Sequence, residues 1–322
     1  MKTLAVAFEA LPESRRRIEE AVAGLAEVAY LGDPDFFARL PDAEILLVRG
    51  WRGQFPPGTM AGMRRLEMIQ GLFAGVDHLP WEEIPATATV CSNAGAQADA
   101  VAEHALALIL AAAKRIPFHD AAVREGRFPQ EVRSRRLEGL TLGILGYGHI
   151  GRSVAVRAKA FGMRILALNR TGGGEGPVDT WLREDEALRL AAESDVVVCC
   201  LPLTKRTEGT IGGVFLAAMR PEAILVNISR GKVIDEDALF EHLRTHPEFT
   251  AALDVWWRYP REEGDRPYAR PFHELLNVVM TPHVAFSATD NAERVLAHAL
   301  ENVSRHLRGE PIRNVAQREE YL

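Results

Sequence analysis

Short apolar runs alternate with segments of helical spacing along most of the chain. In the first third the apolar runs read TLAVAF, EVAYL, EILLV, LEMIQ and ATVCSN, and each has the length of a strand. Residues 13–24, between the first two runs, have the apolar spacing of an amphipathic helix. A longer helical pattern extends from about Asp99 to Arg124, and Pro117 is expected to kink or divide it.

The alternation restarts after a polar, arginine-rich segment. Six nearly continuous apolar runs follow, LTLGILG, MRILALN, DVVVCCL, AILVNIS, TAALDV and NVVMTPH. Such runs are typical of a parallel sheet that is covered on both faces. Helices are expected at 150–161, 179–193 and 235–244, with a last helix at 288–307 that ends before GEP. This order predicts a doubly wound α/β sheet, in which TGGGEGP forms a flexible loop.

Length, charge and cysteine content narrow the class of protein. The chain has 322 residues, enough for two domains with separate cores. A formal net charge of −6 leaves no basic excess to neutralise phosphates, so we expect no nucleic-acid partner. The most apolar helical stretch, ALALILAAA, has about half the length of a membrane span, and Glu9 interrupts the amino-terminal apolar run. Three scattered cysteines predict neither a disulfide framework nor a metal site and fit a reducing, cytoplasmic setting.

A glycine motif follows the first strand of the second series. GILGYGHIG carries the pattern G-x-G-x-x-G between a predicted strand and a predicted helix. Glycines at this spacing allow a tight turn and a close approach of backbone to a pyrophosphate, and the helix N-terminus contributes free N–H groups. The predicted dinucleotide site comprises Gly146, Tyr147, Gly148, His149, Ile150 and Gly151.

The next strand ends in LALNRT, where an NAD-binding unit usually has an acidic residue for the ribose hydroxyls. A carboxylate there would repel a 2′-phosphate, whereas Asn169 is neutral. Arg170 offers a planar guanidinium that suits a phosphate, and Thr171 adds a hydroxyl. We therefore expect a preference for NADP, with NAD also possible. The alternative is that Arg170 faces solvent and the protein discriminates weakly between the two nucleotides.

Seven segments resemble, in the same order, motifs of the D-isomer-specific 2-hydroxyacid dehydrogenases, a family that includes phosphoglycerate dehydrogenases and glyoxylate/hydroxypyruvate reductases. They are GLFAGVDHL, NAGAQADAVAEHALALIL, GILGYGHIG, LPLTKRTEGTIG, NISRGKVIDEDAL, ALDVW and TPHVA, and the likeness covers nearly the whole chain. The resemblance implies an oxidoreductase that moves a hydride between nicotinamide and C2 of a small 2-keto or 2-hydroxy acid such as glyoxylate or hydroxypyruvate.

The same resemblance implies an architecture. It consists of two doubly wound parallel-sheet domains, with a Rossmann nucleotide domain at 98–287 inserted into a smaller, flavodoxin-like substrate domain formed by 1–97 and 288–322. It also implies a homodimer built partly through the long helix after Asp99.

The resemblance assigns roles by position. Arg230 of NISRG matches the arginine that binds the substrate carboxylate and carbonyl, a task that suits a guanidinium. His283 of TPH matches the acid/base histidine, and an imidazole titrates near neutral pH. Asp254 matches a residue at the nicotinamide end of the cofactor. Further substrate positions are Ala74, Gly75 and Val76, and further cofactor positions are Leu201, Pro202, Thr207 and Ile228.

One family position is occupied differently. The family pattern D-V-x-x-x-E-P places a glutamate beside the catalytic histidine, whereas this chain reads DVWWRYP, with Tyr259 at that place. A tyrosine can orient the imidazole by a hydrogen bond, but it does not stabilise the charged ring as a carboxylate does. We therefore expect an active enzyme whose reduction falls off at a lower pH than in relatives with glutamate. Glu262, Glu263 and Glu274 are alternative carboxylates nearby in the sequence.

Two other functions remain open. One is a nucleotide-sensing regulatory or scaffold protein on the same fold with weak catalysis, since some relatives use nucleotide binding to control assembly. The other is a dehydrogenase for a larger aromatic or phosphorylated hydroxyacid. In that case Trp256, Trp257 and Tyr259 would form an aromatic wall, although they could equally be core or interface residues.

Overall fold

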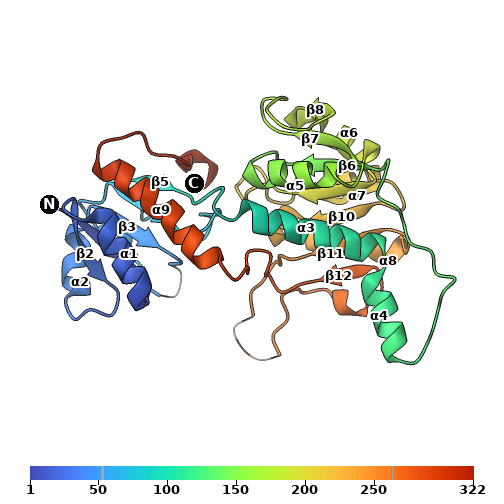
Figure 1. The fold of residues 1–322 in the computed structure, drawn as a ribbon, viewed down its shortest axis with the longest axis horizontal. Coiled ribbons are helices and arrows are strands. Elements are labelled where there is room, and N and C mark those ends of the chain that lie inside the picture. Colours follow the sequence, from blue (N-terminus) through green and yellow to red (C-terminus); the bar gives the residue numbers. More distant parts are fainter. Residues whose placement is uncertain (52–53, 261, 263) are drawn as a thin grey trace. The chain divides into compact units, whose positions relative to one another are not determined.

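The computed structural model describes residues 1–51, 54–260, 262 and 264–322. The chain divides into two compact units. Unit 1 comprises Met1–Gln97 and Thr289–Leu322, and unit 2 comprises Ala98–Ala288. Each unit contains one sheet in which every strand pair is parallel (Figure 1).

Unit 1 is built on a five-stranded sheet of order β2-β1-β3-β4-β5, the strand order of flavodoxin-like proteins. Adjacent residues of a strand enter cores on opposite faces, since Leu4 and Val6 of β1 pack with α1 and α9, and Ala5 packs on the other face with α2. The elements are β1 (Lys2–Val6), α1 (Pro12–Val22), β2 (Ala26–Tyr30), α2 (Phe36–Arg39), β3 (Ile45–Val48), β4 (Met68–Gly71), β5 (Thr89–Cys91) and α9 (Asn291–Leu307).

Unit 2 contains a seven-stranded sheet of order β12-β11-β10-β9-β6-β7-β8. Around β6 the order is that of the Rossmann fold, with β7 and β8 on one side and β9, β10 and β11 on the other. The strands are β6 (Thr141–Leu145), β7 (Arg164–Leu168), β8 (Thr180–Leu182), β9 (Val196–Cys199), β10 (Ile224–Asn227), β11 (Thr250–Leu253) and β12 (Val278–Met280). The helices are α3 (Ala98–Ala113), α4 (Ile116–Arg124), α5 (His149–Lys159), α6 (Ala187–Glu193), α7 (Gly213–Ala218) and α8 (Glu236–Thr245).

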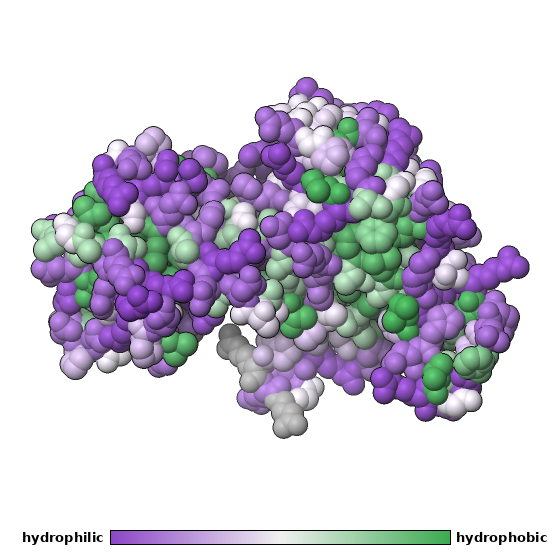
Figure 2. Space-filling model, in the orientation of Figure 1, coloured by the Kyte–Doolittle hydropathy of each residue, from purple (hydrophilic) through white to green (hydrophobic). Residues whose placement is uncertain are grey.

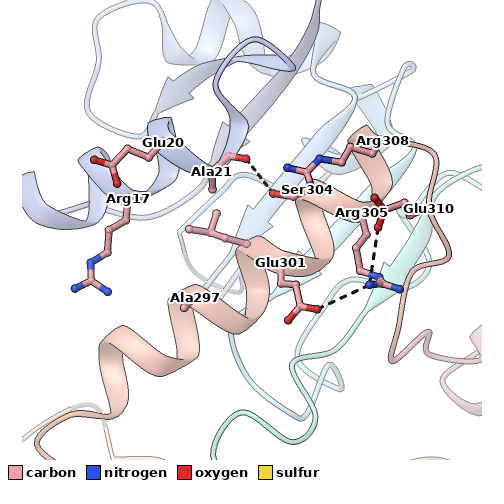
Figure 3. A pocket seen from close by; sticks show the side chains of 10 residues that line it. Arg17, Glu20, Ala21, Ala297, Glu301, Ser304, Arg305, Arg308 and Glu310 are labelled. Carbon is pink, nitrogen blue, oxygen red and sulfur yellow. Dashed lines mark hydrogen bonds and ion pairs between the residues drawn. The ribbon is translucent and has the colours of Figure 1, made fainter.

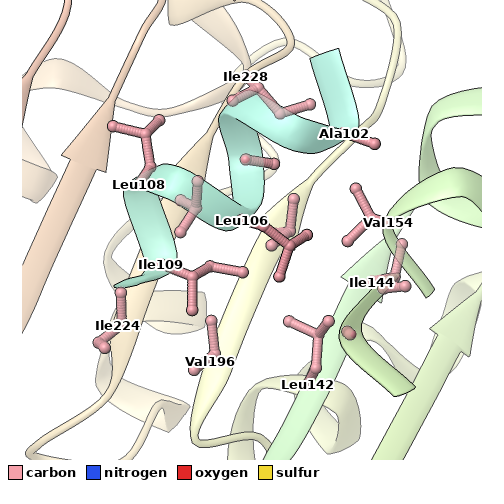
Figure 4. Packing of buried hydrophobic residues seen from close by; sticks show 14 of the residues in the cluster. Ala102, Leu106, Leu108, Ile109, Leu142, Ile144, Val154, Val196, Ile224 and Ile228 are labelled. Carbon is pink, nitrogen blue, oxygen red and sulfur yellow. The ribbon is translucent and has the colours of Figure 1, made fainter. Parts of the chain in front are cut away.

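Two helical layers cover the sheet of unit 2. Helices α3 and α5 pack on one face, and Figure 4 shows Leu106 and Ile109 of α3 directed toward Leu142 and Val196 of the sheet. Helices α6, α7 and α8 pack on the other face. Because both faces are covered, the strands are apolar at nearly every position, as the sequence pattern predicted. The predicted fold class is confirmed.

Three predicted helices differ from the structure. The segment 179–193 is helical only from residue 184 onward, because Thr180–Leu182 instead forms β8, which pairs with β7. The long helix predicted at 99–124 is divided, with α3 ending at Ala113 and Arg115 in the left-handed region at φ 52°. A proline ring clashes with the carbonyl four residues earlier, so Pro117 ends α3 at Ala113 and begins the first turn of α4. The last helix begins at Asn291, three residues later than predicted.

Within the described part of the chain, no helix is both long and apolar enough to cross a membrane. Among the same residues, no group of three or more histidine, cysteine, aspartate or glutamate side chains is placed to hold a metal ion.

Candidate active site

The loops that follow the strands of unit 2 carry most of the predicted site residues. In a parallel sheet these loops meet at one edge, which is the ligand-binding edge of doubly wound folds. The glycine turn follows β6, the Asn169 loop follows β7 and the Leu201 loop follows β9. Arg230 follows β10, Asp254 follows β11 and His283 follows β12. Ile228 is buried in the core under α3.

The glycine turn has the geometry that a pyrophosphate requires. Gly146 has φ 98°, and a Cβ on it would lie 2.9 Å from the carbonyl carbon of Cys200. A Cβ on Gly151 would lie 2.6 Å from the carbonyl oxygen of Gly146. At Gly148 a Cβ would meet nothing within 4 Å, so open space lies beside the residue that precedes α5. The turn therefore fits a nucleotide phosphate at the N-terminus of α5, where His149 is exposed and Ile150 is half-buried.

Tyr147 packs inward from this turn. Its ring makes an edge contact with Trp181, with the ring centroids 4.8 Å apart. Its hydroxyl is buried and has no hydrogen-bond partner within the described part of the chain. Burial raises the pKa of Tyr147, an effect that Arg152 partly opposes. A Cβ on Gly176 would lie only 2.2 Å from that hydroxyl, so the loop after β7 folds over the glycine turn.

Asn169 organises the loop after β7. Its Oδ1 accepts hydrogen bonds from the backbone N–H groups of Thr171 at 3.1 Å, Gly172 at 2.8 Å and Gly173 at 3.3 Å. Its Nδ2 donates to the carbonyl of Gly173 at 2.8 Å, which a carboxylate could not do. Asn169 is thus a neutral side chain beside the predicted nucleotide position. It also shapes the loop, a second role that the sequence did not reveal. Arg170 and Thr171 are exposed on this loop.

The loop after β9 lies against the glycine turn. A Cβ on Gly146 would lie 3.0 Å from the backbone nitrogen of Leu201. Thr207 closes this loop, because its hydroxyl donates to the carbonyl of Pro202 at 2.6 Å and accepts from the N–H of Thr204 at 2.8 Å. The structure therefore places the backbone of Leu201 beside the glycine turn, and the Thr207 hydroxyl holds the loop at Pro202.

Arg230 lies on a turn held by Asn227. The Asn227 side chain accepts from the N–H of Ser229 at 3.1 Å and donates to the carbonyl of Arg230 at 3.0 Å. The guanidinium of Arg230 donates to the carbonyl of Ser229 at 2.8 Å. A Cβ on Gly231 would lie 2.1 Å from the carbonyl carbon of Trp256, so this turn is packed tightly against the loop after β11.

Asp254 is a fully buried carboxylate that fixes the His283 loop. Its Oδ1 accepts from the hydroxyl of Thr281 at 2.6 Å and from the N–H of Val284 at 3.0 Å, and its Oδ2 accepts from the N–H of Ala285 at 3.1 Å. Burial by itself would raise the pKa of Asp254. The hydrogen bonds from His104, Thr281 and the two amides outweigh burial, and the pKa is lowered.

His283 occupies a strained backbone conformation between these anchors. Its φ is 56°, a region that costs a residue with a Cβ on the order of 1–2 kcal/mol. Thr281 lies two residues before His283, and Val284 and Ala285 come directly after it. The hydrogen bonds of Asp254 therefore fix the backbone on both sides of His283. The indole of Trp256 adds a hydrogen bond to the carbonyl of Thr281 at 2.9 Å.

The structure separates the three residues of the suggested aromatic wall. The ring of Tyr259 lies 5.4 Å from the ring of His283, so the structure brings these two residues together. Trp256 and Tyr259 line a pocket beside His283. Trp257 instead stacks on Phe272 and donates to the carbonyl of Ile234 at 2.7 Å, and it does not line this pocket. Both indoles pack in the core on the α8 side, where Trp256 is buried and Trp257 is half-buried.

Two of the nearby glutamates make other contacts. Glu262 is exposed, and its backbone N–H donates to the side chain of Asp265. Glu274 is also exposed and lies 3.8 Å from the imidazole of His273. Glu263 lies outside the described residues.

His104 of α3 belongs to the same network, a role that sequence reasoning missed. Its Nε2 lies 3.1 Å from the hydroxyl of Thr281 and 3.3 Å from Oδ1 of Asp254. About 150 residues separate His104 from Asp254 in the chain. The only sequence signal was its place in the segment that resembles the family, next to the apolar run of α3.

The predicted substrate loop is in unit 1, after β4. Val76 is buried in the core, and its carbonyl accepts from the indole of Trp81 at 2.9 Å. The carbonyl of Phe73 accepts from the N–H of Asn93 at 2.9 Å. These contacts hold the loop through the carbonyl oxygens of Phe73 and Val76. At its tip Ala74 is exposed and Gly75 is half-buried.

Unit 1 also contains a large cavity between α1 and α9, of about 620 Å³ (Figure 3). Three of its charged side chains pair with one another, since Arg305 lies 3.9 Å from both Glu301 and Glu310. The hydroxyl of Ser304 donates to the carbonyl of Ala21 at 3.0 Å and so joins the two helices. The ion pairs lie within α9 and the segment that follows it, and the candidate catalytic residues lie elsewhere.

The sheet order of unit 2, its glycine turn and the anchored histidine define a dinucleotide-binding protein of the Rossmann type. The family described as "D-isomer specific 2-hydroxyacid dehydrogenase, NAD binding domain" matches residues 106–285. The chain belongs to this family.

Individual relatives agree with this assignment. A glyoxylate reductase of Thermococcus litoralis is 37% identical over 72% of this chain and 71% of its own length. A D-3-phosphoglycerate dehydrogenase of Archaeoglobus fulgidus is 32% identical over 87% of this chain. This chain covers only 52% of that enzyme, so it spans about half the length of such relatives. A D-isomer specific 2-hydroxyacid dehydrogenase of Xanthobacter autotrophicus, solved with NADPH, has a TM-score of 0.80 at 26% identity and covers 100% of this chain and 99% of its own.

Proposed function

We propose that this chain transfers a hydride between a nicotinamide nucleotide, preferentially NADP, and C2 of a 2-keto or 2-hydroxy acid. The observation that carries the proposal is the anchoring of His283 by buried Asp254, at the sheet edge that also carries the glycine turn and Arg230. A strained histidine held by several hydrogen bonds is typical of a functional position. Relatives named glyoxylate reductase and hydroxypyruvate reductase support the reaction class.

Each residue has a defined task in this proposal. The guanidinium of Arg230 binds the substrate carboxylate and polarises the C2 carbonyl, and His283 gives its proton to the oxygen during reduction. Tyr259 orients the imidazole from the side, since its ring lies 5.4 Å away. When bound, the reduced nucleotide supplies the hydride. Unit 2 is the nucleotide domain in this account. Unit 1 is the substrate domain in this account, and Ala74, Gly75 and Val76 on its loop after β4 are its substrate-binding positions.

The preference for NADP rests on the loop after β7. Asn169 presents no negative charge, and Arg170 and Thr171 are exposed next to it. Relatives solved with NADPH support this preference. Replacing Arg170 with alanine should raise the KM for NADPH about tenfold, in the range of one lost charge-assisted contact, while the KM for NADH changes less than twofold. Equal effects on both nucleotides would contradict this role of Arg170.

The experiment that tests the function is a screen of NADPH and NADH against glyoxylate, hydroxypyruvate and other 2-keto acids. We expect consumption of NADPH with at least one keto acid and slower consumption of NADH. Tight nucleotide binding without turnover of any keto acid would contradict the proposal and favour a nucleotide-sensing scaffold.

We also propose a homodimer formed through the α3–α4 region. Ile116 and Val123 of α4 are 54% and 58% exposed, and Phe128, just beyond α4, is 75% exposed. Figure 2 shows hydrophobic residues interrupting the hydrophilic surface in the region of α4. Light scattering of the purified chain should give twice the chain mass, and Phe128→Glu together with Val123→Glu should halve it. A monomer in the unaltered protein would contradict the proposal.

The three cysteines, Cys91, Cys199 and Cys200, are free thiols in the structure. Burial raises the pKa of Cys199 and Cys200, so neither is activated as a nucleophile. Free thiols support the proposal that the protein works in the cytoplasm.

A further inference from the structure

A pocket of about 350 Å³ lies beside His283 in unit 2. Its walls come from the loops that follow β11 and β12, and we call it the aromatic pocket. Besides three proline rings, its walls are Trp256, Tyr259, Tyr268, Met280, Thr281 and His283. The volume lies within the range of small-molecule pockets, which begins at about 300 Å³.

The walls of the aromatic pocket are held in place by their own contacts. The indole nitrogen of Trp256 donates to the carbonyl of Thr281 at 2.9 Å and so joins the two loops. The rings of Trp256 and Tyr268 lie 5.4 Å apart, and Tyr268 also packs on Phe272 at 5.7 Å. Phe272 is fully buried, so this side of the pocket rests on the core of unit 2. A pocket with walls fixed in this way can select among ligands by shape.

The aromatic pocket also selects by polarity. Among the described lining residues there is no aspartate, glutamate, lysine or arginine, and His283 is the one ionisable base. The family pattern would place a glutamate at position 259, next to the imidazole. Tyr259 leaves this wall uncharged, so an apolar group can enter without removing a carboxylate from water, a step that is costly when the charge is left unpaired.

We propose that the aromatic pocket binds the side chain of the keto acid, and that this side chain is an uncharged aliphatic or aromatic group. His283 is part of the wall, so a substrate whose C2 oxygen meets the imidazole can extend its carbon chain along Met280 and Tyr268. The inference rests on the proposed function, because it describes the substrate end that Arg230 does not bind. The proposed reaction specifies no side chain on the keto acid. This inference predicts a strong preference for larger apolar substrates over pyruvate and glyoxylate.

The test compares pyruvate with 4-methyl-2-oxopentanoate, which has the same head group and three more carbons. Each carbon buried from water should raise kcat/KM about fourfold. With three more carbons, kcat/KM with NADPH should be about 60-fold higher for 4-methyl-2-oxopentanoate than for pyruvate. Phenylpyruvate should resemble 4-methyl-2-oxopentanoate. Equal kcat/KM values for pyruvate and 4-methyl-2-oxopentanoate would overturn the inference and leave the reaction class intact.

Variants of the aromatic pocket provide a second test of the inference. Met280 is 38% exposed at the end of β12, and Met280→Asp places a charge in the pocket. It should lower the ratio of the two kcat/KM values at least tenfold, whereas Met280→Leu should preserve the ratio. Val214 of α7 is 74% exposed and does not line the pocket, so Val214→Asp is the matched control and should leave the ratio unchanged. An unchanged ratio in Met280→Asp would overturn the inference.

A binding measurement separates this inference from the proposed function. Saturation-transfer difference NMR on the unaltered protein should show transfer to the methyl groups of 4-methyl-2-oxopentanoate, and Met280→Asp should abolish it. If no keto acid is reduced but this transfer is seen, the proposed reaction fails and the pocket assignment stands. If keto acids are reduced but no transfer reaches the methyl groups, the pocket assignment fails and the reaction stands.

Discussion

Replacing Asp254 with asparagine removes the charge at the centre of the candidate site with almost no change in shape. The carboxylate is 0% exposed and accepts four contacts, three on Oδ1 and one on Oδ2. The amide oxygen of asparagine can replace Oδ1. Its NH₂ group then faces the N–H of Ala285, which lies 3.1 Å from Oδ2 in the unaltered protein. Two donors would therefore point at each other beside His283.

The structure sets the expected magnitude. A hydrogen bond to a charged group contributes about 1.5–3 kcal/mol, and leaving a buried donor unsatisfied costs about 1–3 kcal/mol. The substitution loses the Ala285 bond and weakens the others, so we expect about 3 kcal/mol less free energy of unfolding for unit 2. Asp254 has a lowered pKa, so its contribution is present above the unfolded value of about 3.9 and is lost as the pH falls through the lower folded value.

The assay measures the free energy of unfolding of the unaltered protein and of Asp254→Asn in urea, at pH 7 and at about pH 3.5. Hydrogen exchange of residues 281–286 gives the local readout. The deficit should be full at pH 7 and smaller at about pH 3.5, where the Asp254 carboxyl of the unfolded chain, with a pKa of about 3.9, is already mostly protonated. Amides of Val284 and Ala285 should exchange faster in the variant, and keto-acid reduction should fall more than tenfold. Asp237→Asn, at an exposed carboxylate on α8 paired with Arg270, should change little. A deficit below about 0.5 kcal/mol at pH 7 would refute the anchoring role, since that is the scale of ordinary surface substitutions.

Three further predictions concern the glycine turn, Tyr259 and the Arg230 turn. Gly148→Ala should keep the thermal stability but weaken NADPH binding in a fluorescence titration, because its Cβ enters open space beside α5; Gly151→Ala should lower the melting temperature as well, since its Cβ would lie 2.6 Å from the backbone of Gly146. Tyr259→Glu should extend keto-acid reduction to higher pH, because a carboxylate next to His283 favours the protonated imidazole; identical pH–rate profiles would remove Tyr259 from the mechanism. Gly231→Ala should destabilise unit 2 by about 3 kcal/mol in urea unfolding, because its Cβ would overlap the backbone of Trp256; a stable and fully active variant would contradict the packing described.

The sequence predicted those parts of the fold that depend on local pattern. The runs from LTLGILG to NVVMTPH form strands because each is apolar on both faces, and the structure covers both faces of the sheet and leaves the edge strand β12 partly exposed. The sequence pattern did not predict strand β8, because Thr180–Leu182 is short and adjoins a helical stretch. What makes it a strand is its partner, since Asp179 at its start accepts the N–H of Ile165 in the neighbouring chain segment at 2.6 Å. No local propensity encodes that contact.

The candidate site shows the same division. Gly146, Gly148 and Gly151 could be recognised because their spacing reflects what the turn needs geometrically. The partnership of His104 with Asp254 could not, because it joins α3 to the loop after β11 and depends on how the two pack. The aromatic pocket was predicted only in part. The sequence suggested an aromatic wall of Trp256, Trp257 and Tyr259, whereas the structure places Trp256 and Tyr259 beside His283 and directs the indole of Trp257 to the carbonyl of Ile234, outside the pocket.

The most direct test follows the hydrogen itself. NADPH carrying deuterium at the transferable C4 position should be oxidised by the purified protein in the presence of 4-methyl-2-oxopentanoate or glyoxylate. The hydroxy acid formed should contain one deuterium at C2, and His283→Asn should slow its formation at least a hundredfold, in the range of lost acid–base catalysis. Hydroxy acid without deuterium at C2, or none formed with any keto acid, would contradict the account.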